Sequence, residues 1–278
     1  MIVSGLLAVL LQAAVQAQSP VKPLSIVNVA LHQFEDGPPI LSGHQFIPGE
    51  TVFFSMQVQA YQVTPDRKVR LSYRIEASDS DGTLLAEIQA GKVETDLSDM
   101  DKDWLPRIRH SVLVPPHALP GEFRIGAWVK DENSGREAKA EASFMVQGRQ
   151  VETSGSLALR NFRFLRGEES EALLAAAYRP GDTLWARFDI TGFKAGEKNR
   201  IRVVYGISIM SPSGKVLFSE PQAAIDEEAP FYPKRYVPGI ASLNVQPKTA
   251  PGQYTLVVTV SDEVGEQTAV GHFIFRVE

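Results

Sequence analysis

The sequence contains no cysteine, and this absence removes several classes of protein at once. Without a thiol there is no disulfide, no cysteine nucleophile, no thiolate metal site and no lipid-modified cysteine of a bacterial lipoprotein. The 278-residue length exceeds one typical domain and predicts two. A sandwich of about 120 residues buries about two-thirds of the surface that its unfolded chain exposes, so each domain can form a core without covalent links.

Basic side chains are fewer than acidic ones, 28 against 33, which gives a net charge of −5. Domains that bind nucleic acid concentrate Lys and Arg to neutralise phosphates, so the composition argues against nucleic acid as a partner. Residues 24–147 carry 12 basic and 18 acidic side chains, whereas residues 148–278 carry 15 of each. The acidic excess of the first half indicates either a solvated surface or a cationic partner.

Long apolar runs are missing except at the N-terminus, where residues 1–15 are almost wholly apolar. The run is shorter than the roughly 20 residues that a spanning helix needs. Val15 and Ala17 are small residues at the positions that a signal peptidase reads, although no basic residue precedes the run. We therefore predict a signal peptide at 1–17 cleaved after Ala17, and a mature, exported chain without a transmembrane segment, in the periplasm or outside the cell. A retained anchor is the alternative.

The chain repeats itself at a nearly constant offset. Phe46–Val52 returns 132 residues later as Tyr178–Leu184, and Pro120–Phe123 returns at an offset of 131 as Pro251–Tyr254. The stretch 147–156 between the copies is polar, contains glycine and lacks periodicity, as linkers do. The repeat predicts two domains that arose by duplication, at residues 24–147 and 156–278, joined by a mobile linker that has little to bury.

Each copy is a series of short runs with apolar residues two apart. Val52, Phe54, Met56 and Val58 alternate with polar or outward positions, which is typical of a strand with one face in a core. Asp81–Gly82 between two such runs predicts a hairpin turn. About seven strands recur in each copy. The expected fold is all-β, with two tandem immunoglobulin-like antiparallel β-sandwiches after the signal segment.

Three motifs punctuate these strands: Pro-Gly-Glu/Asp-Thr at 48–51 and 180–183, Pro-Ser-Gly-Lys at 212–215, and Ala-Pro-Gly-Gln-Tyr at 250–254. Together they resemble bacterial Ig-like and macroglobulin-type sandwich domains, over both copies. The resemblance implies the fold and a general role as a spacer or interaction module. Macroglobulins proper carry a cysteine thioester and a bait segment, which this sequence does not have, so protease trapping does not carry over.

Catalytic and metal-binding motifs are scarce. The five histidines do not stand at the spacing of a metal pair, and there is no Gly-x-Ser-x-Gly elbow. These absences favour a protein that is not an enzyme and has no cofactor. A cluster of acidic residues after residue 93 gives calcium candidates, with a solvated acidic loop as the alternative explanation. The candidates are Asp96, Asp99, Asp101 and Asp103.

Aromatic residues in one connection between strands are the candidate binding residues. Phe231 and Tyr232 align with Asp99 and Met100 of the first copy and so have no aromatic counterpart, which predicts that both are exposed and belong to a binding surface. Trp104 and Tyr236 align with each other, and we expect both side chains to be mostly buried at the open end of their own sandwich.

The sequence therefore predicts an exported, non-catalytic structural or protein-interaction module of a bacterial cell envelope or exterior. A carbohydrate-binding protein that uses aromatic loop residues is the alternative, and a hydrolase comes third. The partner is an unknown macromolecule, and a protein is favoured over a glycan.

Overall fold

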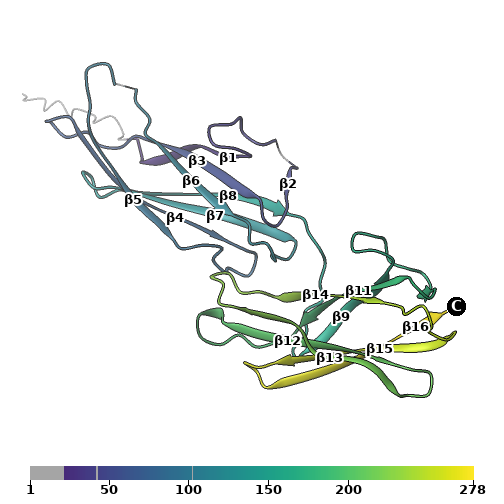
Figure 1. Cartoon of the computed structure of the whole chain (residues 1–278). Helices are drawn as coiled ribbons and strands as arrows, with labels where there is room; N and C mark the ends of the chain where they lie inside the picture. Colours follow the sequence, from purple (N-terminus) through teal and green to yellow (C-terminus); the bar gives the residue numbers. More distant parts are fainter. Residues whose placement is uncertain (1–21, 42, 102) are drawn as a thin grey trace, which may run out of the picture.

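The computed structural model describes residues 22–41, 43–101 and 103–278, and in them sixteen β-strands form (Figure 1). The proposed signal peptide at 1–17 lies outside the described residues. The strands of the first half are β1 (Ser25–His32), β2 (Gln45–Phe46), β3 (Thr51–Gln59), β4 (Lys68–Ser78), β5 (Gln89–Asp96), β6 (Arg107–Leu113), β7 (Gly121–Asp131) and β8 (Glu137–Val146).

The second half begins with β9 (Ala158–Leu165), β10 (Ala177–Tyr178) and β11 (Thr183–Thr191), which a short 3-10 turn, η1 (Glu197–Asn199), separates from the rest. The remaining strands are β12 (Ile201–Met210), β13 (Val216–Glu228), β14 (Tyr236–Asn244), β15 (Gly252–Asp262) and β16 (Gln267–Val277). Among the residues described, no helix is long and apolar enough to cross a membrane.

The two halves have the same topology. In the first, a three-stranded sheet β1-β3-β6 faces a five-stranded sheet β2-β8-β7-β4-β5, and the second half repeats this order as β9-β11-β14 and β10-β16-β15-β12-β13. Strand pairs are antiparallel except β2–β8 and β10–β16, which are parallel. The predicted all-β class and the two sandwiches are confirmed. The short strands β2 and β10 make eight strands in each half, where the sequence predicted about seven.

The period-2 pattern places one apolar row of each strand in a core. Val52, Phe54, Met56 and Val58 of β3 are almost completely buried, and so is the corresponding row of β11. Burial of such a side chain contributes about 1.5 to 3 kcal/mol relative to its exposure, so these rows fix which face of each strand turns inward.

The Pro-Gly-Glu/Asp-Thr motif forms a turn that needs a glycine at its second position and an acidic side chain at its third. Gly49 and Gly181 have φ of +90° and +97°, a region that favours glycine because it has no Cβ. The carboxylate of the next residue accepts a hydrogen bond from the backbone amide three residues earlier. Glu50 Oε2 accepts a hydrogen bond of 2.8 Å from the Ile47 amide, and Asp182 accepts one from the Arg179 amide. The motif therefore starts β3 and β11 in the same way.

Strands β7 and β15 both end in a completely buried aspartate. Asp131 accepts hydrogen bonds from the Gln62 amide at 2.8 Å and from the Asn133 amide at 3.1 Å. Asp262 accepts them in the same way from Lys194, Val264 and Gly265. Buried carboxylates require such donors, so Asp131 and Asp262, which lie 131 residues apart, each close a turn of their own sandwich.

The segment between the sandwiches is anchored to the second one. Arg149 lies 2.7 Å from the buried carboxylate of Asp189, which also accepts a 2.8 Å hydrogen bond from Asn161. Val151 is buried. Burial raises the pKa of Asp189, whereas Asn161 and Arg149 oppose that shift. The expectation that this linker has little to bury is wrong, because its own Val151 is buried and its Arg149 pairs with the buried Asp189.

Candidate functional site

The connection between β13 and β14 reaches from the second sandwich to the first. We call residues 230–235 the junction segment. Tyr232 is 8% exposed and packs into the core of the first sandwich. Its hydroxyl donates a 2.8 Å hydrogen bond to Asp79 Oδ2. Burial, together with this bond and the charge of Asp79, raises the pKa of the Tyr232 phenol, so it stays protonated and remains a donor.

Asp79 holds a turn of the first sandwich with the rest of its carboxylate. Its Oδ1 accepts hydrogen bonds from the amides of Asp81, at 3.0 Å, and Thr83, at 2.8 Å. Asp79 is itself buried, so Tyr232 completes the set of donors around a carboxylate that water reaches poorly. Arg235 lies 3.7 Å from Asp81 and adds an exposed ion pair across the same contact.

Charged side chains of the second sandwich surround the junction segment. Lys234 Nζ lies 2.8 Å from Asp226 and also contacts Glu228. Burial lowers the pKa of Lys234, but the hydrogen bonds to these two carboxylates outweigh it and raise the pKa. On the facing sandwich the His117 ring meets Tyr236 edge-on at 5.6 Å, and burial, then the charge of Lys234, lowers the pKa of His117.

A cleft of about 500 Å³ lies where the two sandwiches meet. One wall belongs to the first sandwich and the other to the junction segment. Phe231, at 50% exposure, lines it beside Tyr232. Its other lining residues are Leu85, Ala86, Glu87, Leu113, Pro115, Pro116, His117, Glu228, Pro230 and Lys234. A mostly apolar cleft with a few polar groups at its edge suits an apolar side chain of a partner.

The two aromatic residues that the sequence predicts to be exposed together, Phe231 and Tyr232, differ in their exposure in the structure. Phe231 is exposed, as predicted, but Tyr232 is not, because its ring fills the first core and its hydroxyl pairs with Asp79. Tyr236 is buried, and Trp104 is half-buried against Tyr61, whose hydroxyl donates to the Trp104 carbonyl. The sequence could not place Tyr232, because its partners come from the other repeat.

The alignment of Trp104 with Tyr236 is also wrong. Gln57 pairs with Arg107 in the first sandwich, and Asp189 pairs with Pro238 in the second. The offset is therefore already 131 at β6, and Tyr236 occupies the place of Leu105. Before the loop the offset is 133, since Val69 pairs with Thr95 and Ile201 pairs with Glu228. The loop is therefore two residues shorter in the second sandwich, and no periodicity marks this difference.

The acidic candidates for calcium do not converge. Asp99 lies 2.6 Å from Arg67, and Asp101 accepts hydrogen bonds from the amide and hydroxyl of Ser98 in its own turn. In the described part of the chain, no group of three His, Cys, Asp or Glu side chains could hold a metal ion. The prediction of calcium at Asp96, Asp99, Asp101 and Asp103 thus finds no support there.

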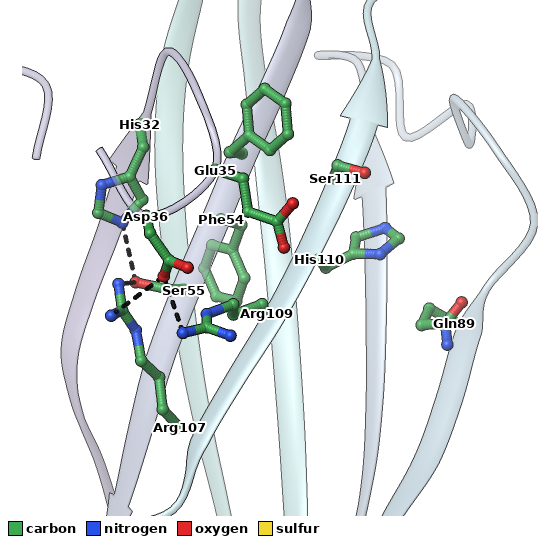
Figure 2. Close-up of a pocket in the computed structure, with 11 residues that line it drawn as sticks. His32, Glu35, Asp36, Phe54, Ser55, Gln89, Arg107, Arg109, His110 and Ser111 are labelled. Atoms are coloured by element: carbon green, nitrogen blue, oxygen red, sulfur yellow. Dashed lines mark hydrogen bonds and ion pairs between the residues drawn. The ribbon is translucent and has the colours of Figure 1, made fainter. Parts of the chain in front are cut away.

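A second, polar pocket lies on the outer face of the β1-β3-β6 sheet, with a volume of about 280 Å³ (Figure 2). His32 Nε2 and Ser55 Oγ, both buried, are 2.9 Å apart. Asp36, from the loop after β1, pairs with Arg109 at 2.8 Å and with Arg107 at 3.4 Å.

A serine beside a histidine is a possible nucleophile and base, which the sequence did not reveal because the two lie 23 residues apart. In catalytic pairs a third group orients the imidazole. Here His32 Nδ1 has no hydrogen-bond partner among the described residues, and the Asp36 carboxylate faces the arginines. We therefore assign no reaction to the pair. The sequence feature that could have located this pocket is the alternation of mostly apolar with mostly polar side chains along β3 and β6, which places Ser55, Arg107 and Arg109 on the outer face.

Tyr232→Phe should lower the free energy of unfolding of the first sandwich by about 1.5 to 3 kcal/mol, because a hydrogen bond to a buried carboxylate is lost while the ring remains. Denaturant unfolding of the two-domain chain measures this. Tyr73→Phe is the matched control, since the Tyr73 hydroxyl bonds to no described side chain or backbone group. Equal effects of the two substitutions would contradict the role of the Tyr232 hydroxyl.

No protein-family model matches the sequence, and no curated protein matches it. Among solved structures, the chain is similar to the C-terminal domain of the antigen I/II polypeptide BspA of Streptococcus agalactiae. The identity is 9%, the match covers 91% of this chain and 100% of that chain, and the TM-score is 0.31.

It is similar also to the C-terminal domain of the antigen I/II-family protein AspA of Streptococcus pyogenes, with 10% identity over 92% of this chain and 99% of that chain and a TM-score of 0.33. Red sea bream transglutaminase gives 9% identity over 93% of this chain and 32% of that chain, with a TM-score of 0.29. At these identities the likeness is one of fold alone.

Proposed function

We propose that this chain is an exported, non-catalytic interaction module of a bacterial envelope or exterior. Its two sandwiches, at residues 24–147 and 156–278, are in this proposal products of a duplication. The shared topology and the repeated buried aspartates support the duplication. The apolar N-terminal run, with small Val15 and Ala17 after it, supports export to the periplasm or beyond, after cleavage at Ala17.

The observation that carries the proposal is the cleft between the sandwiches. Its walls come from two domains that Tyr232 and Asp79 hold together, so its shape is largely formed before a partner arrives. Phe231 is half exposed at this cleft, and an aromatic ring contributes a large contact area with few torsions to fix. A protein partner that inserts an apolar side chain beside Phe231 fits this surface.

The test compares Phe231→Ala with Phe34→Ala, an exposed phenylalanine on the first sandwich outside the cleft. Each purified chain is used to capture proteins from an envelope extract of the source organism. The protein that the wild type retains should be retained at least tenfold less by Phe231→Ala, because central aromatic anchors contribute about 2 kcal/mol or more. Phe34→Ala should leave retention within about twofold. Equal retention by all three chains, or binding on a glycan panel alone, would contradict a protein-binding cleft.

A further inference from the structure

The second sandwich has an open apolar groove. It lies between β13 and β14, which are edge strands of the two facing sheets, and has a volume of about 480 Å³. Leu217 and Phe218 form one wall, and Phe218 is 41% exposed. Tyr254 and Phe275 of the core lie at its base. An apolar groove of this size, open to water on a sheet edge, is unusual unless something covers it.

The first sandwich has its groove at the same place, and there a side chain of the second sandwich occupies the part of it next to Asp79. Leu85 and Leu113, which line the cleft between the sandwiches, correspond to Leu217 and Asn244 of the second groove at offsets of 132 and 131. The occupying residue is Tyr232, supplied by the loop after β13 of the following sandwich. The chain thus contains one example of a loop from one sandwich that places a side chain in the groove of the sandwich before it.

The matching loop of the first sandwich enters no groove in the part of the chain that the structure describes. It follows β5 at the end of the first sandwich remote from the second (Figure 1). Met100 is an apolar residue within this loop, and it is 93% exposed. Among the described residues, one groove and one loop therefore have no partner, and they lie at opposite ends of the chain.

We propose that copies of this chain associate head to tail, with Met100 of one copy in the groove between β13 and β14 of the next. The residues of the second groove suit a methionine side chain better than a tyrosine. Where Tyr232 meets the carboxylate of Asp79, the second groove has Ser211, so no buried acceptor requires a hydroxyl from the incoming side chain. Ile209 replaces Ala77 and narrows the groove, which suits an unbranched, flexible methionine.

Charges favour the same pairing. The Met100 loop is acidic, with exposed Asp99 beside the methionine. Exposed Lys215 and Lys248 flank the groove: Lys215 precedes the β13 wall, and Lys248 stands between the lining residues Gln246 and Thr249. The pairing places the acidic half of one copy, with its net charge of −6, against the neutral half of the next. Because the groove and the loop are different surfaces, the contact does not close on itself and can extend into a filament.

Sedimentation velocity of the two-domain chain over a concentration series tests this. We expect the average sedimentation coefficient of the wild type to rise with concentration, and the rise to weaken between about 50 mM and 500 mM salt. Met100→Asp and Phe218→Asp should each lower the association constant at least tenfold. Leu174→Asp, at an exposed position outside both surfaces, is the control and should behave as the wild type.

The decisive experiment is sedimentation velocity on a mixture of the Met100→Asp and Phe218→Asp variants. Met100→Asp retains a working groove and Phe218→Asp retains a working loop, so their mixture should form a one-to-one dimer that does not grow. A wild type that stays monomeric up to about 1 mM would overturn the proposal. So would a mixture that fails to dimerise while both variants unfold thermally like the wild type. If Phe218→Asp unfolds early, Leu217→Asp, also exposed on that wall, takes its place.

Discussion

Phe123→Ala should lower the free energy of unfolding of the first sandwich by about 3 to 5 kcal/mol. Phe123 is 3% exposed and lies two residues after the start of β7 at Gly121. Its ring packs against Phe144, which in turn meets Phe46 edge-on. Removal of the ring leaves a cavity among side chains held by two sheets, which cannot collapse to fill it.

Equilibrium unfolding in denaturant, monitored by a signal from the first sandwich, measures the loss for Phe123. Met145→Ala on the neighbouring strand β8 is the control, because Met145 is exposed and should change stability by less than about 1 kcal/mol. A similarly small change for Phe123→Ala would show that the ring does not support the core.

Asp131→Ala should destabilise the same sandwich by a comparable amount, about 3 to 5 kcal/mol, for an electrostatic reason. The carboxylate is completely buried and satisfies the amides of Gln62 and Asn133 as well as the Ser134 hydroxyl. Arg136 lies 3.4 Å away and would lose its counter-ion. Alanine leaves several donors without an acceptor in a place that water reaches poorly.

The neighbouring Glu132 provides the control for Asp131. It also accepts a hydrogen bond, from Ser72, but it is exposed, so Glu132→Ala should cost less than about 1 kcal/mol. Asp262→Ala should reproduce the large effect in the second sandwich. Equal, small effects of Asp131→Ala and Glu132→Ala would show that water replaces the carboxylate and that the buried network does not stabilise the fold.

The fold was predictable because its signals are local. Alternation along β3 and β11 marks which side chains turn inward, and Gly49 and Gly181 mark turns that need a positive φ. Both signals act between residues a few positions apart, so a single sequence contains them.

The candidate site was only half predictable, since its contacts join distant residues. Phe231 and Tyr232 are adjacent in sequence, yet Tyr232 meets Asp79, 153 residues away, and Phe231 does not. No periodicity encodes such a contact. His32 and Ser55 were missed for the same reason: their proximity depends on the pairing of β1 with β3, which the sequence alone does not specify.

The parallel pairs β2–β8 and β10–β16 have a mechanical consequence. Each joins a strand near the start of its sandwich to the strand that ends it, so tension applied along the chain pulls the two partners in opposite directions along their own axes. Hydrogen bonds in that geometry are loaded in shear and must break together, whereas a hairpin pulled at its open end loses them one at a time. The two residue pairs of each parallel contact, Gln45–Met145 with Phe46–Val146 and Ala177–Arg276 with Tyr178–Val277, are thereby loaded together rather than in sequence.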